Sequence, residues 1–318
     1  MLVLSRSDVE KLLDLDQLVD ALARAHAQLS AGETSMPPRI AALVPEREAL
    51  LGVMPAYLPG AVLACKLVTL FPQNRDRHTH QAAIMVFNHT NGTPLALMDG
   101  TYITAARTAA ASALATRYLA REDARVLAII GTGVQARSHA DALGRVCAFD
   151  ELRVAGRDPA KVARLARELG GRAADSYEEA LRGADVVAAT THAVEPVVQR
   201  AWLDPGVHIN SVGLNPVGRE VDAATVADAL LVVESRDSAC APPPGGAPEL
   251  VDVDPTHIHA ELGELVRGDR PGRTSPDQIT LYKSVGVAVQ DAAAAALVLA
   301  AARTRGAGRQ IELEELNT

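Results

Sequence analysis

Residues 126–136 combine an apolar run with three small residues at the spacing that binds the pyrophosphate of a dinucleotide. The run Val-Leu-Ala-Ile-Ile is followed by Gly131-x-Gly133-x-x-Ala136. Gly131 would allow a tight turn out of a strand, Gly133 would let the backbone approach phosphate, and Ala136 would keep the next helix close to the sheet. The anion is then expected on the free N–H groups at the start of that helix. The alternative is an ordinary strand-turn-helix whose glycines serve packing alone.

The residues that end the second strand of such a unit select the cofactor. An Asp or Glu there accepts the ribose 2′-OH of NAD, whereas an Arg favours the 2′-phosphate of NADP. The chain reads Ala155-Gly156-Arg157-Asp158 at this point. Arg157 therefore favours NADP over NAD. In the alternative interpretation Arg157 is a solvated loop residue, and Asp158 binds the ribose.

Three cations lie upstream, in segments that are otherwise apolar or tightly turned. Arg39 follows Met-Pro-Pro, Lys66 sits inside Ala-Cys-Lys-Leu-Val, and Arg107 lies in an Ala- and Thr-rich run. A cation in an apolar run needs a partner or an anionic ligand, because burying it alone is costly. Three converging cations would clamp a carboxylate, and Lys66 could also act as an acid or polarise a C=N bond. The alternative is three structural ion pairs or snorkelling side chains.

A short polar segment, His78 to Gln81, could act as a metal site or an acid/base cluster. Its spacing fits no zinc template well, and the loop that precedes it is expected to be exposed. Hydrogen bonding in the substrate pocket by Thr79 is therefore favoured, and no metal site is predicted.

Hydrophobic periodicity predicts the elements that must position these groups. From residue 126 onward, short apolar strands alternate with helical stretches, as in a parallel sheet with crossover helices. Residues 36–99 are β-rich, and Asn91-Gly92 suggests a hairpin turn. The predicted strands of the alternating region are Val126–Ile130, Leu152–Ala155, Val186–Ala189, His208–Val212 and Leu230–Val233.

Helices are predicted at both ends of the chain and around the β-rich segment. Ser7–Ala31 reads as one helix, with Ser7 as N-cap and Glu10 completing a capping box. Thr104–Leu119 is a long Ala-rich helix, and a last helix, Val287–Arg303, is expected to pack on the first domain.

Length and composition limit the class of protein. A chain of 318 residues suggests two domains. A net charge of −8 and an aromatic content of 3% argue against a nucleic-acid partner. The three cysteines form no C-x-x-C pair, and neither a signal peptide nor a membrane span is evident. A cytoplasmic location is expected.

Taken together, these residues resemble the ornithine cyclodeaminase/mu-crystallin family, with matches along nearly the whole chain. Gln135-Ala136 and Arg107-Thr108 are fairly specific to this group. The matching segments are Met36-Pro-Pro-Arg39, Met54-Pro-Ala-Tyr57, Lys66, Thr79-His-Gln81, Asp99-Gly100, Thr104-x-x-Arg107-Thr108, Gly131-x-Gly-x-Gln-Ala136, Asn210-x-Val-Gly213 and Lys283-Ser-Val-Gly286.

The resemblance implies an α/β fold in which a Rossmann dinucleotide-binding domain, residues 121–289, joins an α+β substrate-binding and dimerisation domain. The second domain comprises residues 1–120, completed by the C-terminal helix 290–318. The resemblance also implies a homodimer and a role in amino acid metabolism. Its members share hydride exchange between a nicotinamide cofactor, NADP or NAD, and the α-carbon of an amino or imino acid.

The resemblance also implies the roles of individual residues. Arg39, Lys66 and Arg107 match the positions that hold the substrate carboxylate, and Met54 and Thr79 complete the predicted substrate site. The predicted cofactor-binding residues are Thr108, Gly131, Thr132, Gly133, Val134, Gln135, Ala136, Arg157, Asp158, Thr190, Thr191, Val212, Gly213, Ser284 and Gly286.

One departure from the family pattern bears on the reaction. Ornithine cyclodeaminases carry an Asp after the Val-Gly pair, where this chain has Asn215. Asn can hydrogen-bond but cannot take a proton at neutral pH. Reduction of a preformed imine needs only a proton donor, which Lys66 could supply. A ketimine reductase of the pyrroline-2-carboxylate type is therefore favoured, with Lys66 and Asn215 as the predicted catalytic positions. The alternatives are ornithine cyclodeaminase, alanine dehydrogenase, and a non-catalytic NADP-dependent binding protein.

Overall fold

The computed structural model describes residues 1–213, 215, 217–242 and 245–312, and it divides into two compact units. Unit 1 comprises Met1–Arg107 with the segment from Val287 to the C-terminus, and unit 2 comprises Thr108–Gly286. The predicted boundaries were 120 and 289. The first boundary instead falls inside a continuous helix, α3 (Gly100–Leu119). No turn residue interrupts this helix, so nothing in the sequence marks the crossing.

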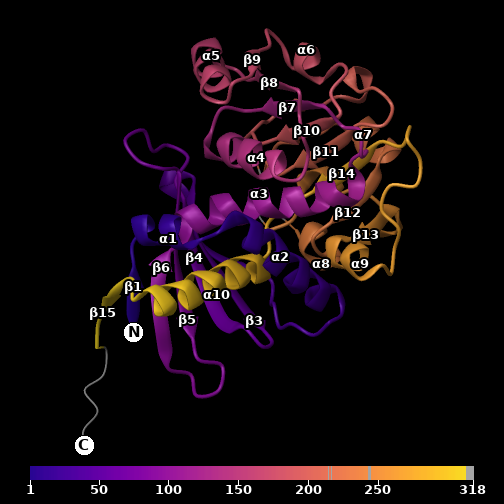
Figure 1. Cartoon of the computed structure of the whole chain (residues 1–318). Coiled ribbons are helices and arrows are strands. Elements are labelled where there is room, and N and C mark those ends of the chain that lie inside the picture. Colours follow the sequence, from indigo (N-terminus) through magenta and orange to yellow (C-terminus); the bar gives the residue numbers. More distant parts are fainter. Residues whose placement is uncertain (214, 216, 243–244, 313–318) are drawn as a thin grey trace, which may run out of the picture. The chain divides into compact units, whose positions relative to one another are not determined.

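Unit 1 is built on a seven-stranded mixed sheet (Figure 1). Its central strands form an antiparallel meander, β3 to β6, and β1 joins β6 in parallel. The turn predicted at Asn91-Gly92 connects β5 to β6, and Gly92 has a φ of 77°. The strands, in the order β15-β1-β6-β5-β4-β3-β2, are Arg309–Gln310, Leu2–Leu4, Pro94–Asp99, His80–Phe87, Val62–Leu70, Ala49–Leu58 and Ile40–Val44.

The N-terminal helix predicted over Ser7–Ala31 is in fact two helices. Helix α1 (Arg6–Leu12) begins at the N-cap Ser5, whose capping-box partner is Asp8 rather than Glu10. Helix α2 (Leu15–Ser30) begins at a new N-cap, Asp14. Because the Asp14 side chain accepts from a backbone N–H of the next turn, it starts a second helix where the apolar periodicity alone suggested continuity.

The last helix, α10 (Ala288–Arg305), lies across the sheet of unit 1, as the sequence predicts (Figure 1). It packs against β3, β4 and β5 and against α2. The chain then forms β15 at the sheet edge, and residues 313–318 of the predicted C-terminal segment lie outside the described residues.

At the other edge of the sheet, a 3-10 turn, Pro45–Arg47, links β2 to β3.

The two faces of this sheet differ. Along β4, Ala64 and Lys66 are buried on the face that α10 covers, whereas Leu63 and Leu67 alternate onto the opposite face and are exposed. The buried face therefore carries both the core of unit 1 and a charged side chain.

Unit 2 contains an eight-stranded sheet in which every pairing is parallel. All five predicted strands are present within one residue of their expected bounds, and the predicted α/β class is confirmed. Strands β9, β13 and β14 were not predicted, because they are short or mix polar with apolar residues. In the order β13-β12-β14-β11-β10-β7-β8-β9, the strands are Ile258–Glu261, Leu230–Val233, Thr280–Lys283, His208–Ser211, Val186–Ala189, Val126–Ile130, Glu151–Ala155 and Arg172–Ala173.

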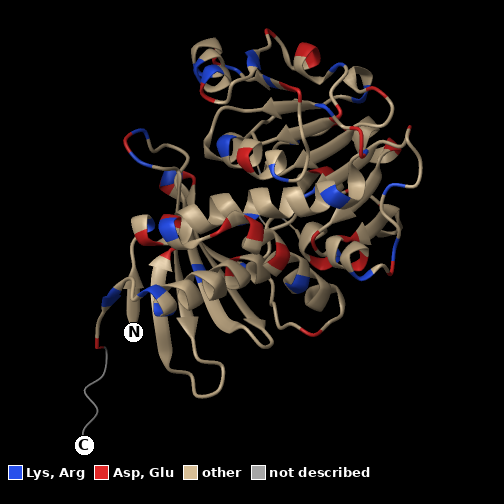
Figure 2. Ribbon diagram, in the orientation of Figure 1, with Lys and Arg blue, Asp and Glu red and all other residues tan. Residues whose placement is uncertain are grey.

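Helices connect these strands, and almost all the apolar side chains of the central strands are fully buried. Charged residues lie mainly on the helices and loops (Figure 2). The helices are α4 Val134–Gly144, α5 Pro159–Glu168, α6 Tyr177–Leu181, α7 Ala223–Asp228, α8 Arg236–Ala239 and α9 Leu262–Arg267, with 3-10 turns at Arg200–Trp202, Pro248–Leu250 and Pro255–His257.

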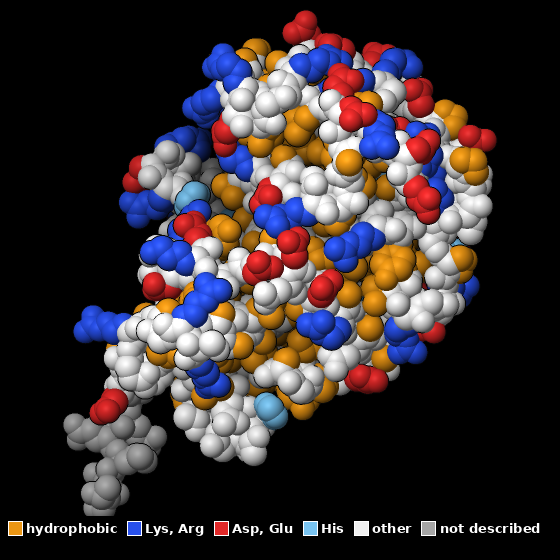
Figure 3. Space-filling model, in the orientation of Figure 1, with side chains coloured by type: hydrophobic (Ala, Val, Ile, Leu, Met, Phe, Trp, Pro, Cys, Tyr) orange, Lys and Arg blue, Asp and Glu red, His pale blue; other side chains and the backbone are white. Residues whose placement is uncertain are grey.

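Two further observations concern the charge on one face and the hydropathy of the helices. On the face drawn in Figure 3, Lys and Arg are interspersed with Asp and Glu rather than gathered into a basic field. None of the helices in the described part of the chain combines the length and hydropathy that a bilayer crossing requires.

Candidate active site

The turn between β7 and α4 has the backbone that the glycine fingerprint predicts. Gly131 has a φ of 119°, a region that favours glycine. A Cβ added there would lie 2.7 Å from Thr190 Oγ1 and 3.0 Å from the Thr190 carbonyl oxygen. A Cβ on Gly133, by contrast, would meet nothing within 4 Å. Gly131 is thus required by the fold, whereas Gly133 faces open space.

The start of α4 has the properties of an anion site. Its N-cap is Gly133, which offers no capping side chain, whereas α5, α6, α7 and α8 all begin with a side chain that accepts from their first turn. Arg137 donates to the Thr132 and Gly133 carbonyls and forms an ion pair with Glu168. The first N–H groups of α4 are therefore left for an external acceptor, which fits a dinucleotide pyrophosphate.

The residues after β8 have distinct roles. Gly156 packs between Thr132 and Val162, and Arg157 is exposed. Asp158 is the N-cap of α5, and its Oδ1 accepts from the backbone N–H groups of Ala160 and Lys161. The Asp158 carboxylate thus already caps a helix, whereas the guanidinium of Arg157 lies in solvent.

Buried carboxylates, which sequence reasoning missed, organise the loops after the central strands. Glu220 accepts from the backbone N–H of Thr191 at 2.6 Å, from that of Gly213 at 2.8 Å and from the Ser211 hydroxyl. It therefore joins the loops that follow β10 and β11, which contain the predicted cofactor residues Thr190, Thr191, Val212 and Gly213.

Two more buried acids act on the Lys283–Gly286 segment. Lys283 forms an ion pair with Glu249 at 3.0 Å. Glu234 accepts from the Ser284 hydroxyl and from the N–H of Gly286. These polar groups of Ser284 and Gly286 are therefore engaged within the protein. No sequence motif signals such acids, because their role depends on loops that meet only in the folded unit.

The substrate residues predicted from sequence all belong to unit 1. Lys66 pairs across the sheet with Met54 on β3 and Ile84 on β5, and all three are buried. Its ammonium lies 2.7 Å from Asp291 Oδ2, and the two side chains are each 2% exposed. Arg107 Nε donates to Asp291 Oδ1 at 3.1 Å. One carboxylate thus bridges two buried cations.

The electrostatics of Lys66 follow from this setting. Burial lowers the pKa of Lys66 to about 7, Asp291 opposes that shift, and the nearby charges of Arg107 and Arg39 add to it. The Arg39 charge is therefore close enough to Lys66 to affect its titration. The charges of Arg107 and Arg39 thus both act on Lys66, and the carboxylate clamp stays a prediction.

Thr79 lies apart from this cluster. It immediately precedes β5, five residues before Ile84, the cross-strand partner of Lys66. At about 3.3 Å per residue, this is roughly 16 Å along the strand. The structure therefore does not bring Thr79 beside Lys66 within unit 1.

Asn215 bonds both to its own loop and to the loop after β10. Its Nδ2 donates to the Ala193 carbonyl at 3.2 Å, and its Oδ1 accepts from the N–H of Val217. Asn215 therefore links two loop segments through backbone contacts.

Thr108, another predicted cofactor residue, lies on α3 and is buried at the start of unit 2.

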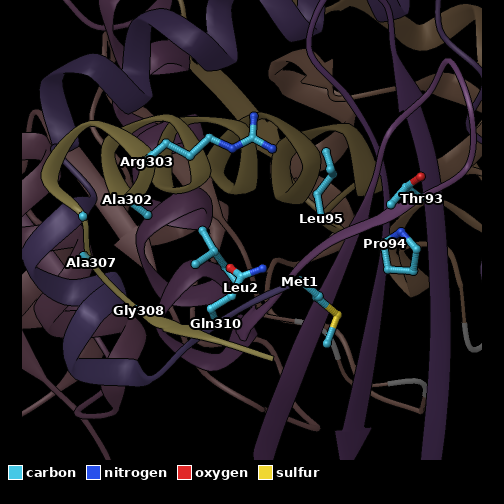
Figure 4. A pocket seen from close by; sticks show the side chains of 11 residues that line it. Met1, Leu2, Thr93, Pro94, Leu95, Ala302, Arg303, Ala307, Gly308 and Gln310 are labelled. Carbon is cyan, nitrogen blue, oxygen red and sulfur yellow. The ribbon is translucent and has the colours of Figure 1, made fainter. Parts of the chain in front are cut away.

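A possible metal cluster and a surface groove were the other candidate sites in the described residues. No cluster of His, Cys, Asp or Glu in these ranges could hold a metal ion. The open groove of Figure 4 lies between β1, β15 and the end of α10, and it contains none of the predicted site residues.

A comparison with protein families decides the classification. The model described as the ornithine cyclodeaminase/mu-crystallin family matches residues 1–306. The chain belongs to the ornithine cyclodeaminase/mu-crystallin family. The resemblance inferred from the motifs is therefore confirmed.

The curated relatives of this chain include proteins named as reductases and dehydrogenases. The ketimine reductase mu-crystallin of Macropus fuliginosus is 37% identical over 308 residues, which cover 93% of this chain and 95% of the relative. A Δ1-pyrroline-2-carboxylate reductase of Bacillus cereus (strain ZK / E33L) is 35% identical over 330 residues, covering 98% and 100%. With relatives this similar over their whole length, the chain is an oxidoreductase.

Solved structures of family members have the same fold. The Δ1-pyrroline-2-carboxylate reductase of Thermococcus litoralis, in complex with NADH and L-proline, matches with a TM-score of 0.93 and 37% identity, covering 98% of this chain and 100% of that one. An archaeal alanine dehydrogenase dimer with bound NAD matches with a TM-score of 0.91 and 31% identity, covering 99% of each.

Proposed function

We propose that this chain is an NAD(P)-dependent ketimine reductase that acts on a small cyclic α-imino acid of the pyrroline-2-carboxylate type. The observation that carries the proposal is the cluster in unit 1. Lys66 and Arg107 share the carboxylate of Asp291, and the charge of Arg39 also acts on Lys66. Two buried cations on one carboxylate leave positive charge that suits a substrate carboxylate.

In this reaction the residues of the chain bind the substrate and move one proton. Arg107 and Arg39 hold the carboxylate, which orients the C=N bond. Lys66, with its pKa lowered to about 7, donates a proton to the imine nitrogen. The nicotinamide cofactor, when bound, supplies the hydride that the α-carbon accepts. The fit of the α4 N-terminus to a pyrophosphate supports unit 2 as its binding site.

Asn215 favours reduction over ornithine cyclodeamination. An amide cannot accept a proton at neutral pH. Its two polar atoms also already bond to the backbone of the surrounding loops. A reduction that begins from a preformed imine needs no base at this position.

NADP is the cofactor that the end of β8 supports. The exposed Arg157 can meet a 2′-phosphate, whereas the Asp158 carboxylate already caps α5 and would have to leave that role to bind a ribose hydroxyl.

The outer face of the unit 1 sheet supports a homodimer. Ile40, Leu51, Leu63 and Leu67 are exposed there, by 67%, 38%, 37% and 42%. Contiguous exposed apolar patches mark interaction sites, protein–protein interfaces among them. A related alanine dehydrogenase is itself described as a dimer. We therefore assign this face to contact with a second copy of the chain.

The deciding experiment measures NAD(P)H oxidation with pyrroline-2-carboxylate and its six-membered homologue. Parallel reactions follow ornithine conversion to proline and pyruvate amination to alanine. We expect turnover of the cyclic ketimines and a preference for NADPH. Proline formation from ornithine at a comparable rate would overturn the interpretation of Asn215. Tight NADPH binding without turnover of any substrate would indicate a binding protein.

A further inference from the structure

Asp291 lies at the centre of the substrate cluster, although neither its position in an Ala-rich helix nor its spacing from Lys66 suggested a role. Its Oδ2 contacts Lys66 Nζ at 2.7 Å, and its Oδ1 accepts from Arg107 Nε at 3.1 Å. It stands in the first turn of α10, where the helix dipole favours a negative charge. The carboxylate therefore separates two cations that would otherwise repel each other in a buried site.

The neighbouring residue, Gln290, fixes the other edge of Arg107. Its Oε1 accepts from Arg107 Nη1 at 2.7 Å, so its Nε2 is the donor toward His26 Nε2, 3.1 Å away. Burial and the charge of Arg107 lower the pKa of His26 to about 3, so this imidazole is neutral and can accept that bond. His26 thereby fixes the orientation of the Gln290 amide, and the amide in turn orients the guanidinium.

We propose that Asp291 is a positioning residue of the substrate site, which keeps the Lys66 ammonium protonated beside Arg107, while Gln290 and His26 lock the guanidinium in place. This inference rests on the proposed function, in which Lys66 is the proton donor and Arg107 anchors the substrate carboxylate. The arrangement brings donor and anchor, from β4 and α3, to the same carboxylate.

The titration of Lys66 follows from all the charged and titratable groups identified around it. Asp291 on α10 is the anion, Arg107 on α3 and Arg39 before β2 are cations, and His26 on α2 is neutral. Among the charges shown to act on Lys66 in the described part of the chain, removing Asp291 leaves Arg107 and Arg39, so the pKa of Lys66 should fall further. An opposite charge at this range shifts a pKa by about 1–3 units.

The first experiment compares the pH profiles of ketimine reduction by the wild-type enzyme and Asp291→Asn. We expect kcat/KM of the wild type to fall as the pH rises through about 7, where Lys66 loses its proton. In D291N this fall in kcat/KM, the alkaline limb of the pH profile, should move at least about one pH unit lower. Activity at neutral pH should then drop roughly tenfold and return on acidification. The titration of the substrate itself cancels, because both enzymes use the same ketimine.

Two further variants separate positioning from folding. Asp291→Glu keeps the charge, so the alkaline limb of its pH profile should lie close to that of the wild type. Asp185→Asn is the control, because it removes a different carboxylate with an Arg partner, Arg121, partly buried at the amino ends of the unit 2 strands. It should lower thermal stability without moving the limb. A uniform loss of rate in D291N with an unmoved limb would overturn the proposal.

The second experiment does not depend on activity. The chain has four lysines, Lys11, Lys66, Lys161 and Lys283, so carbon-13 labelling of lysine side chains gives a sparse NMR spectrum. Lys11 and Lys161 are exposed and serve as internal references. The Lys66 signal, assigned from its absence in Lys66→Arg, should titrate near pH 7 in the wild type and lower in D291N.

The two readouts distinguish failure of this inference from failure of the proposed function. If the wild type reduces no ketimine but the Lys66 titration shifts in D291N, the proposed reaction is wrong and the electrostatic role of Asp291 stands. If the titration midpoint of Lys66 is the same in both proteins, the proposal is overturned whatever the enzyme reduces.

Discussion

At the scale of single residues, Lys66 shows how its surroundings give an ordinary side chain a special reactivity. It lies on a strand, fully covered, with one carboxylate and two guanidinium groups nearby. Burial alone would favour its neutral amine, and the carboxylate partly restores the ammonium. A donor that titrates close to neutral pH is well matched to protonating an imine.

Replacing Lys66 with Ala should abolish ketimine reduction and leave cofactor binding intact. A general acid contributes about 10²–10⁴-fold to a rate, so kcat should fall by at least that factor. Steady-state kinetics measure the rate, and quenching of NADPH fluorescence measures binding. Lys11→Ala, which changes an exposed lysine of α1, is the matched control. If the rate of Lys66→Ala matches that of the control, Lys66 is structural.

Replacing Arg157 with Ala should change which cofactor the enzyme prefers. A hydrogen bond to a charged phosphate contributes about 1.5–3 kcal/mol, so KM for NADPH should rise roughly ten- to a hundredfold, with little change for NADH. Arg145→Ala, at the far end of α4, is the control. Equal KM values for NADPH in wild type and Arg157→Ala would show that Arg157 does not meet the 2′-phosphate.

At the scale of elements, the β7–α4 turn shows why a glycine fingerprint predicts local structure well. Its conformation is set by contacts within a few residues of one strand and by its neighbour, β10. The loops after β10, β11 and β14 are different, because buried acids from elsewhere in unit 2 hold them. The hydrogen bonds of Glu220 join two loops that are separate in sequence but adjacent in the sheet.

Gly131→Ala should weaken cofactor binding and lower stability. The added methyl group meets Thr190 at 2.7 Å, and the positive φ is strained for alanine, at a cost of about 1–3 kcal/mol. Thermal unfolding and fluorescence titration with NADPH measure the two effects. Gly170→Ala, with a φ of 69° and nothing within 4 Å, separates backbone strain from the Thr190 contact. Binding by both variants at wild-type affinity would contradict the role assigned to this turn.

At the scale of the whole molecule, the chain passes between its units twice, after Arg107 and after Gly286. The substrate cluster draws on residues next to both crossings, since Arg107 is the last residue before the first and Gln290 and Asp291 follow shortly after the second. Residues far apart in the sequence are thus brought together in unit 1.

The proposed dimer face can be tested at the same scale. Leu67→Asp places a charge on the outer face of the unit 1 sheet, where burial against a second copy would be costly. We expect it to convert a dimer into a folded monomer, as measured by light scattering coupled to size-exclusion chromatography. Val251→Asp, at an exposed apolar residue of unit 2, should leave the dimer unchanged. A wild-type monomer, or a dimer that survives Leu67→Asp, would rule out this interface.

The sequence alone determined the features that depend on neighbouring residues. The apolar run before Gly131, the turn at Asn91-Gly92 and most strands of unit 2 were predictable, because local periodicity and backbone preference decide them. It also singled out Lys66 and Arg107, since a cation in an apolar run needs a counter-charge.

Only the tertiary structure decided what that counter-charge is. Asp291 and Gln290 belong to a helix whose sequence pattern suggests only packing. Ser5 and Asp14 are the N-caps of two helices, where the sequence predicts one helix that begins at Ser7. Glu220, Glu234 and Glu249 likewise gain their roles from loops that meet in the folded unit. Pairing of buried charges depends on distance in space, and a single sequence records only distance along the chain.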